Sequence, residues 1–239
     1  MKRTRPIIAR RRPIIAIDGP VGAGKSVAAR ELARELGYSY LNTGAMYRAV
    51  AVAAREAGID PDAPIVEERL KPLLAGVEMK FDGEKIFLNG RDISDKINQP
   101  EIGDLASRLS ALRIVRERMR ELQRAAGADG GVVMEGRDIG TAIFPDAEFK
   151  FYLDADVKVR AKRRYEELKK KGSSITEQEV LDQMIERDRR DSGRELAPLK
   201  RADDAITIDS SKLSIKQVVA AMKAKIDARI NAAKDLKRA

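Results

Sequence analysis

Apolar and polar positions change along this chain in blocks that predict strands and helices. Ile14–Ile17 is a short apolar run typical of a buried strand, and Lys25–Leu36 has the repeat of an amphipathic helix. Gly37 follows at the position where a left-handed glycine commonly ends a helix. Ala45–Ala57 predicts a second helix, which Gly58 ends. The N-terminal part therefore predicts a strand followed by two helices.

The rest of the chain continues this alternation. Thr176-x-x-Glu179 and Ser214-x-x-Gln217 are capping boxes, which predict where two helices begin. The further predicted strands are Val132–Met134, Phe149–Leu153 and Ala205–Ile208, and the further predicted helices are Ile102–Ala126, Val157–Lys171, Thr176–Asp191 and one from Ser214 toward Ala232. Strands and helices at this spacing predict an α/β fold, with a mainly parallel sheet covered by helices on both faces.

One segment departs from the alternation. Val77–Phe81 and Ile86–Leu88 are strand-like and are separated by Asp82-Gly83, and Asn89-Gly90 offers a second turn. Both dipeptides favour the tight turns of antiparallel hairpins. We therefore expect a small antiparallel sheet inserted into the parallel fold.

A glycine-rich loop follows the first predicted strand and reads G-x-x-x-x-G-K-S. Its glycines let backbone N–H groups approach phosphate oxygens, and the N-terminus of the next helix adds partial positive charge. Lys25 is long enough to reach the β- and γ-phosphates, and the Ser26 hydroxyl is a natural Mg²⁺ ligand. The loop predicts a nucleoside triphosphate site made of Gly19, Pro20, Val21, Gly22, Ala23, Gly24, Lys25, Ser26 and Val27.

Several classes of protein share such a loop, and composition narrows the choice. The 239 residues include no Cys and no His, which excludes Ser-His-Asp catalysis, a thiolate nucleophile and histidine-ligated zinc. The N-K-x-D string of GTPases does not occur. Val132–Glu135 is the nearest match to the acidic strand of motor ATPases, but the Gly-Arg-Asp that follows departs from that pattern. Carboxylates, hydroxyls, Lys, Arg, backbone amides and bound ions must supply the chemistry.

Arginines recur beside loops and at predicted element ends, namely Arg48, Arg137, Arg187, Arg190 and Arg194. A guanidinium binds phosphate oxygens through two parallel hydrogen bonds and neutralises charge on a phosphoryl group in transfer. Phosphoryl transfer depends on positioning and electrostatics, so it can proceed without histidine.

Five strings make the chain similar to the bacterial cytidylate kinase family, the (d)CMP kinases among the nucleoside monophosphate kinases. They are Ile17–Ser26, Thr43–Arg48, Gly136–Thr141 with Phe144-Pro145, Arg187–Asp191 and Ile208–Ser210. They occur in family order over about residues 14–230. The resemblance implies a P-loop nucleoside monophosphate kinase-like fold with a small antiparallel monophosphate-side insert and a helical lid.

The resemblance also implies roles for single residues. Ser107, Arg116 and Asp138 stand where the family contacts cytosine, and a carboxylate is the expected acceptor for the exocyclic amino group of that base. Asp191 stands where the family holds the sugar hydroxyls. The residues implied around the acceptor phosphate are Thr43, Arg48, Arg137, Arg187 and Arg194, with Arg190 and Arg194 candidates to reach the transferring group.

Two positions differ from common family members. Val27 stands where many members have Thr, so a hydroxyl for the α-phosphate is missing, and Thr43 stands where some have Ser. Neither change removes a required group, and we expect at most a modest change in nucleotide affinity.

The formal net charge of +9 lies mainly in the tails. Residues 1–12 carry six of these charges and residues 14–233 carry a net +1, so the body is nearly neutral. We expect a basic tail over 1–13, a kinase domain over 14–233 and a C-terminal tail over 234–239. Within the domain we expect a monophosphate-binding insert at about 62–100 and a lid at about 157–190, whose arginines either close over the phosphates or form a solvated helix face.

These patterns and the resemblance predict transfer of the γ-phosphoryl group of ATP to CMP or dCMP, with Mg²⁺ bound by Ser26. We expect a cytoplasmic protein without a membrane partner, because no apolar run reaches the roughly 20 residues of a membrane span. We also expect a monomer, and no nucleic-acid partner since the body is nearly neutral. Two alternatives stay open. One is a related kinase for UMP, AMP or another small acceptor, and the other is a nucleotide-dependent RNA-binding protein that uses the basic tails.

Overall fold

Five strands form the central sheet in the order β2-β6-β1-β7-β8. They are β1 (Ile14–Asp18), β2 (Ser39–Asn42), β6 (Val132–Gly136), β7 (Phe149–Asp154) and β8 (Ile206–Asp209). β1 runs parallel to β6 and β7, and β7 runs parallel to β8. The carboxyl ends of parallel strands share one edge, so the loops after β1, β6 and β7 begin side by side there.

This computed structural model describes residues 12–82, 85–170 and 172–236. Their contacts separate into two units, one within Met1–Leu41 and Gly127–Ala239 and the other Asn42–Ala126. The first unit holds the parallel sheet and the second holds a three-stranded sheet in the order β3-β4-β5. Both sheet types follow the expectation from the sequence.

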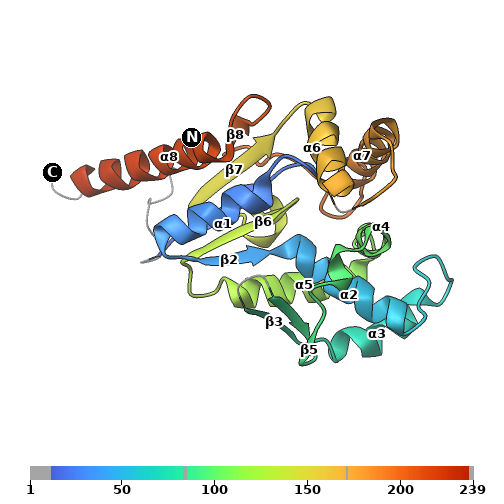
Figure 1. Cartoon of the computed structure of the whole chain (residues 1–239). Helices are drawn as coiled ribbons and strands as arrows, with labels where there is room; N and C mark the ends of the chain where they lie inside the picture. The colour runs from blue at the N-terminus through green and yellow to red at the C-terminus, as the bar shows by residue number, and fades with distance from the viewer. Residues whose placement is uncertain (1–11, 83–84, 171, 237–239) are drawn as a thin grey trace. The chain divides into compact units, whose positions relative to one another are not determined.

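Two helices cover one face of the parallel sheet. α1 (Lys25–Leu36) and α8 (Ile215–Leu236) pack against each other and against the strands (Figure 1). Gly37 ends α1 in the left-handed conformation, as predicted, with φ 64°. β1 is buried at all five residues, which explains why it reads as a continuous apolar run rather than an alternating one.

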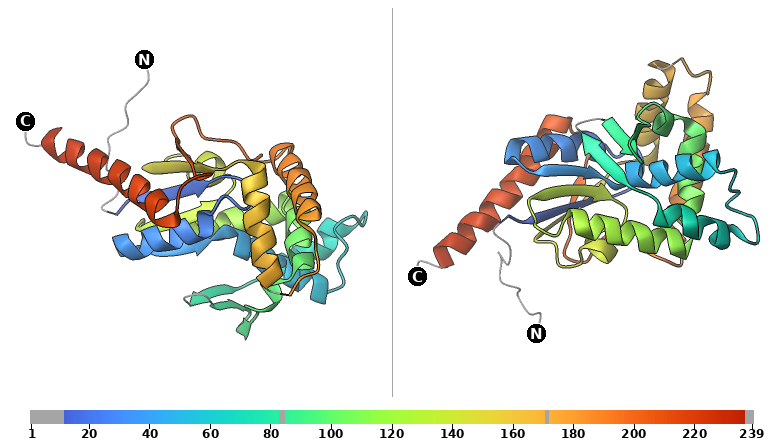
Figure 2. Two further views of the ribbon diagram at one scale, coloured as in Figure 1. Left: turned by 45° about the horizontal axis from the view of Figure 1, so that its top comes forward. Right: turned by 90° about the horizontal axis from the view of Figure 1, so that it is seen from below.

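A helix pair follows β7. α6 (Val157–Lys170) and α7 (Glu177–Ser192) lie side by side, which Figure 2 shows from two directions, with Ala161, Val180 and Met184 buried between them. The predicted capping box begins α7: Glu179 N–H donates to the Thr176 hydroxyl, and Glu179 accepts from Thr176 N–H.

The second unit combines helices with the antiparallel sheet. Its elements are α2 (Thr43–Glu56), α3 (Val66–Ala75), β3 (Met79–Asp82), β4 (Lys85–Leu88), β5 (Arg91–Asp92), the 3-10 turn η1 (Lys96–Asn98), α4 (Pro100–Leu109) and α5 (Arg113–Ala126). Asn89 and Gly90 both have positive φ, 50° and 77°, as the predicted turn between β4 and β5 requires. Gly83 of the other predicted turn lies outside the described residues.

The prediction of one helix over Ile102–Ala126 is wrong. The structure has α4 and α5 with a turn at 110–112 between them. Ser110 marks the break, because its hydroxyl donates to Ser107 O at 2.8 Å and its carbonyl accepts from Arg116 Nη1 at 3.1 Å. A serine that bonds to nearby backbone competes with the helical pattern.

The sequence patterns also missed several elements. Among them are the strand β2, the helix α3 and the π-helical turn η2 (Ile139–Ile143). β2 is short and only partly buried, α3 carries Pro72 inside it, and the π-turn has no periodicity of its own. Each therefore lacked the repeat on which the predictions depend.

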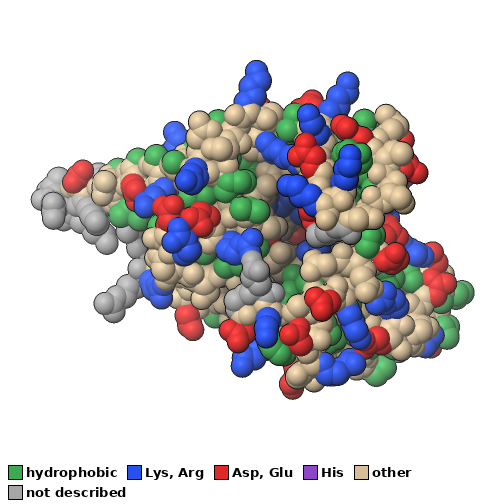
Figure 3. Space-filling view, viewed as in Figure 1, with side chains coloured by type: hydrophobic (Ala, Val, Ile, Leu, Met, Phe, Trp, Pro, Cys, Tyr) green, Lys and Arg blue, Asp and Glu red, His purple; other side chains and the backbone are tan. Residues whose placement is uncertain are grey.

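The surface agrees with a nearly neutral body. Basic and acidic side chains are interspersed over the face seen in Figure 3. Among the described residues, every helix is too short or too polar to cross a membrane.

The first prediction concerns Gly19, at the start of the loop after β1. Its φ is +145°, and a Cβ there would lie 2.0 Å from the Leu153 carbonyl oxygen. Gly19→Ala should lower the free energy of unfolding by at least about 3 kcal/mol, because backbone must move. Gly37→Ala is the matched control: its φ is also positive, but a Cβ there meets nothing within 4 Å, so about 1 kcal/mol is expected. Equal losses in urea unfolding would contradict the close packing of Gly19 on β7.

Candidate active site

The loop between β1 and α1 depends on glycine geometry. Gly19, Gly22 and Gly24 have positive φ of 145°, 77° and 89°. A Cβ at Gly22 would lie 2.8 Å from Met184 Cε and 3.1 Å from Arg160 Cβ, so α6 and α7 pack directly against the loop. The glycines that the sequence pattern selects are therefore required by both conformation and packing.

Side chains hold the carbonyl groups of this loop. Pro20 O accepts from Lys25 Nζ at 2.6 Å, Val21 O accepts from Arg160 Nη1 at 3.0 Å, and Ala23 O accepts from the Ser210 hydroxyl at 3.0 Å. Lys25 and Arg160 are 5% exposed and Ser210 is 2% exposed. These buried bonds fix the loop before any ligand binds, as a preorganised anion site requires.

Burial also changes the charge of Lys25. Desolvation lowers its pKa from 10.5 to about 7, and repulsion from Arg137 adds to this, against attraction to Glu135, Asp18 and Asp191. At neutral pH the charged ammonium is less stable here than in water, and an anion beside it would stabilise it. The site is thus electrostatically suited to phosphate.

Asp191 joins two of the predicted arginines. Its Oδ2 accepts from Arg137 Nε at 3.1 Å and its Oδ1 accepts from Arg194 Nη2. Asp191 is 2% exposed. Burial raises its pKa, but Arg137, Arg194 and Arg187 outweigh this and hold the pKa below the usual value. The carboxylate therefore stays ionised and orients guanidinium groups next to the loop lysine.

The other candidates of the first unit lie on neighbouring segments. Asp138 is 5% exposed and directly precedes the π-turn η2. Arg187 and Arg190 are on α7, where Arg190 Nε lies 3.9 Å from Glu186. The electrostatic neighbours of Lys25 and Asp191 bring Lys25, Arg137, Arg187, Asp191 and Arg194 into one charged cluster.

The remaining candidates belong to the second unit. Thr43 begins α2 and is buried, and Arg48 donates to Gly44 O at 3.2 Å one turn later. Ser107 and Arg116, also buried, both contact Ser110, and the Arg116 guanidinium lies 6.0 Å from the Tyr47 ring centre. The turn that separates α4 from α5 thus brings Ser107 and Arg116 together.

Two arginines of the predicted lid have structural partners. Arg160 donates to Ala155 O at 2.8 Å and pairs with Asp188 at 2.7 Å, besides holding Val21. Arg163 donates to both the hydroxyl oxygen and the carbonyl oxygen of Ser210. Arg160 thus connects α6 to the glycine loop directly, and Arg163 connects it through Ser210. Neither prediction for this helix included such a role.

The residues present suit a magnesium ion that is bound mainly through substrate phosphates. Ser26 is exposed at the first turn of α1. The described residues contain no cluster of three acidic, His or Cys side chains for a metal. Mg²⁺ usually keeps several waters and takes one or two protein oxygens together with phosphate oxygens, so a single hydroxyl ligand fits.

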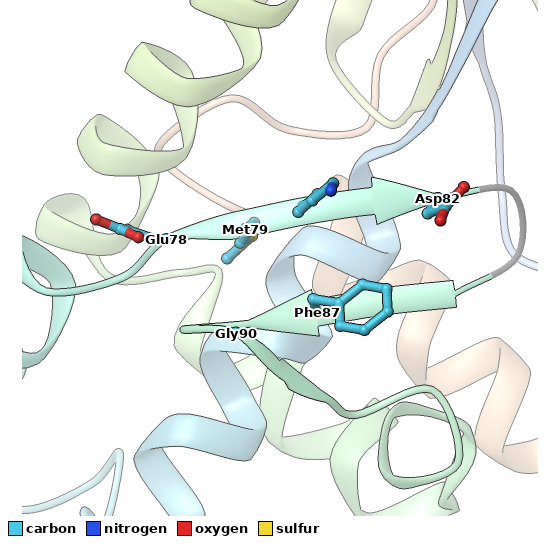
Figure 4. A pocket seen from close by; sticks show the side chains of 6 residues that line it. Glu78, Met79, Asp82, Phe87 and Gly90 are labelled. Carbon is cyan, nitrogen blue, oxygen red and sulfur yellow. The ribbon is translucent and has the colours of Figure 1, made fainter.

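A hollow of about 410 Å³ lies elsewhere, on the small sheet of the second unit (Figure 4). It is lined by Glu78, Met79, Lys80, Asp82, Phe87 and Gly90. Its two carboxylates and single lysine suit a phosphate poorly, and none of the candidate residues lines it. The hollow therefore gives no support to a phosphate site in this part of the second unit.

Comparison with known proteins assigns the chain to a family. The sequence model described as Cytidylate kinase matches residues 15–228. The chain belongs to the cytidylate kinase family. The match covers all five strings on which the resemblance was based, and it confirms the fold class predicted from them.

Curated relatives agree with this assignment. The cytidylate kinase of Citrifermentans bemidjiense is 50% identical over 91% of this chain and 94% of the relative, and that of Thermotoga neapolitana is 43% identical over 91% and 98%. Among solved structures, shikimate kinase from Acinetobacter baumannii in complex with shikimate aligns with a TM-score of 0.44 at 17% identity, over 92% of this chain and 95% of that one. Because that score is below 0.5, the family assignment depends on the sequence relatives.

The sequence patterns gave no role to Asp18 or Ser210, and they gave Arg160 only a role in the lid. Asp18, Arg160 and Ser210 contact the glycine loop or the segment after β6, although Asp18 and Ser210 lie within the quoted strings. Tyr40 donates to Glu135 at 2.8 Å, and burial together with this carboxylate raises the pKa of the tyrosine. For Asp18, a charged residue at the carboxyl end of a buried strand was the available signal.

Proposed function

We propose that this protein transfers the γ-phosphoryl group of ATP to CMP or dCMP and releases ADP with CDP or dCDP. The main support is the charged cluster in the first unit. In it, Lys25 of the glycine loop is an electrostatic neighbour of Arg137, which Asp191 orients. Such a cluster stabilises the negative charge that spreads over a transferring phosphoryl group. Membership of the cytidylate kinase family is the second support.

The triphosphate binds to the glycine loop. Backbone N–H groups of the residues from Gly19 to Val27 cradle the phosphates, and Lys25 contacts the β- and γ-phosphates. The bonds to Pro20, Val21 and Ala23 support this role, because a loop fixed in advance needs no reorganisation on binding. When bound, Mg²⁺ would be held by Ser26 and would neutralise phosphate charge.

The acceptor phosphate is bound by Thr43, Arg48, Arg137, Arg187 and Arg194, and Arg190 and Arg194 extend to the transferring group. Asp191 accepts hydrogen bonds from the ribose hydroxyls. A carboxylate oxygen has two lone pairs, so Asp191 can accept from the sugar while it orients Arg137 and Arg194. The reaction is direct transfer between phosphates and needs no covalent intermediate on the protein.

The base is selected by Asp138, Arg116 and Ser107. The Asp138 carboxylate accepts from the amino group of cytosine, while Arg116 and Ser107 donate to ring acceptors. Uracil presents a carbonyl oxygen where cytosine presents the amino group, so it would leave the buried carboxylate without a donor. This asymmetry supports CMP over UMP.

We further propose a cytoplasmic monomer that acts on nucleotides, in pyrimidine metabolism, without a membrane or RNA partner. The predicted division into tails, kinase domain over 14–233, insert at 62–100 and lid at 157–190 is kept as part of this proposal. Removal of residues 1–12 should leave CMP phosphorylation unchanged, because those residues lie outside the proposed chemistry.

A panel of acceptors tests the function directly. ADP release is measured with MgATP and CMP, dCMP, UMP or AMP. We expect kcat/KM for CMP or dCMP to exceed that for UMP and AMP by at least about fivefold, since rejecting an acceptor that leaves a buried group unpaired costs about 1–3 kcal/mol. A preference for AMP would overturn the substrate assignment, and release of ADP independent of any acceptor would overturn the transfer itself.

The second test concerns Asp138. Asp138→Ala should lower kcat/KM for CMP by at least about thirtyfold, the equivalent of about 2 kcal/mol for a lost base contact, and leave the KM for MgATP within about twofold. Asp146→Ala, an exposed carboxylate of the same segment, is the control and should behave as the parent. Parent-level CMP turnover in Asp138→Ala would show that another group selects the base.

A further inference from the structure

Asp18 is a buried carboxylate that the proposed function does not use. It ends β1, directly before the glycine loop, and is 5% exposed. Removing a carboxylate from water costs several kcal/mol unless hydrogen bonds compensate it. Its two oxygens are committed: Oδ1 accepts from Ile139 N–H at 2.9 Å and Oδ2 accepts from Gly140 N–H at 2.8 Å.

These two N–H groups open the π-turn that follows Asp138. The first N–H groups of a helical turn have no acceptor within the turn and need one from outside. The residue before such a turn often supplies it, and Asp is among the preferred types. Asp138 occupies that position, yet its side chain makes no cap hydrogen bond. Asp18, from another strand, caps the turn in its place.

The backbone around Asp138 is therefore fixed on both sides. Its carbonyl accepts from Ala142 N–H at 2.8 Å and from Ile143 N–H at 3.2 Å, within the turn. The next N–H, of Ile139, is held by Asp18. Contact at Gly140 is close, since a Cβ there would lie 3.4 Å from Asp18 Oδ2 and 3.1 Å from Lys150 Cδ.

We propose that Asp18 is a positioning residue for the selection of the acceptor nucleotide. Because Asp18 caps the π-turn, the Asp138 carboxylate is not needed as the cap and stays directed to the base. The inference rests on the proposed function, in which Asp138 recognises cytosine. An acceptor-only carboxylate is needed at position 18, because one side chain must receive two N–H groups at once.

Asp18→Asn tests this with little change of shape. The asparagine keeps one acceptor oxygen but presents an NH₂ group to the other backbone N–H, which then recruits the Asp138 carboxylate as its cap. We expect the KM for CMP to rise about tenfold and the CMP to UMP ratio of kcat/KM to fall by a similar factor. The KM for MgATP should rise clearly less than the KM for CMP, because Glu135 and Asp191 still attract Lys25; general loosening of the fold would not produce this difference.

Asp154→Asn is the matched control. Asp154 ends β7 at the same edge of the sheet, and its Oδ1 accepts locally, from Ala155 N–H at 2.8 Å, a bond that asparagine can keep. We expect parent values for both substrates in this variant.

The double variant with Asp138→Asn shows whether Asp18 acts through Asp138. If it does, Asp18→Asn changes the CMP to UMP ratio in the parent but not in the Asp138→Asn background. An equal change in both backgrounds, or a KM for MgATP that rises as much as that for CMP, would overturn the inference. An absence of CMP activity in the parent protein would instead reject the proposed function.

Should Asp18→Asn not fold, Gly140→Ala disturbs the same contact from the other side. Its Cβ would crowd the Lys150 side chain at 3.1 Å and would touch Asp18 Oδ2 at 3.4 Å. We expect the same selective loss of CMP discrimination. Hydrogen exchange at the amide of residue 140 shows whether the contact has been weakened. A folded Gly140→Ala protein in which this amide exchanges faster, but the CMP to UMP ratio is unchanged, would contradict the role of Asp18.

Discussion

The first unit is organised around the buried ammonium group of Lys25. Lys25 loses most of its water, and its ammonium donates to a carbonyl oxygen, that of Pro20, while the carboxylates of Glu135, Asp18 and Asp191 act on it as electrostatic neighbours. A desolvated ammonium in such surroundings is less stable than in water, so it favours a ligand that brings negative charge. The glycines, Arg160 and Ser210 hold it in a loop that cannot relax away from this state.

Parallel strand pairing supplies the rest of the cluster. β1 lies between β6 and β7, and Asp18 is aligned with Gly136, so the glycine loop and the Gly136-Arg137-Asp138 segment leave the sheet together. Asp18 joins them by bonds across 121 and 122 residues of sequence. The buried Asp191 then ties Arg137 to the end of α7. Backbone geometry thus brings these charged residues together, and ion pairs with Asp191 orient the arginines.

The sequence predicts well what is periodic or local. α1 has the predicted bounds because its apolar repeat ends at a glycine, and the box at Thr176 begins α7 as expected. The glycine loop also follows from sequence, whereas the ion pairs of Arg137 and Arg194 with Asp191 were not predicted. The sequence could not give the break at Ser110 or the partners of Asp18, Arg160 and Ser210, because those depend on hydrogen bonds to distant backbone or on a competition between local bonds. The roles of the substrate-binding residues stay predictions.

Direct titration of Lys25 tests the central claim most closely. NMR of the lysine side chains, with Lys25→Arg to assign the signal, should give a pKa of about 7 for Lys25 without nucleotide, against 10.5 for an ordinary lysine. The bound phosphates of ATP should raise this pKa, because they favour the charged ammonium. An ordinary pKa in the nucleotide-free protein, or one that ATP leaves unchanged, would contradict the account.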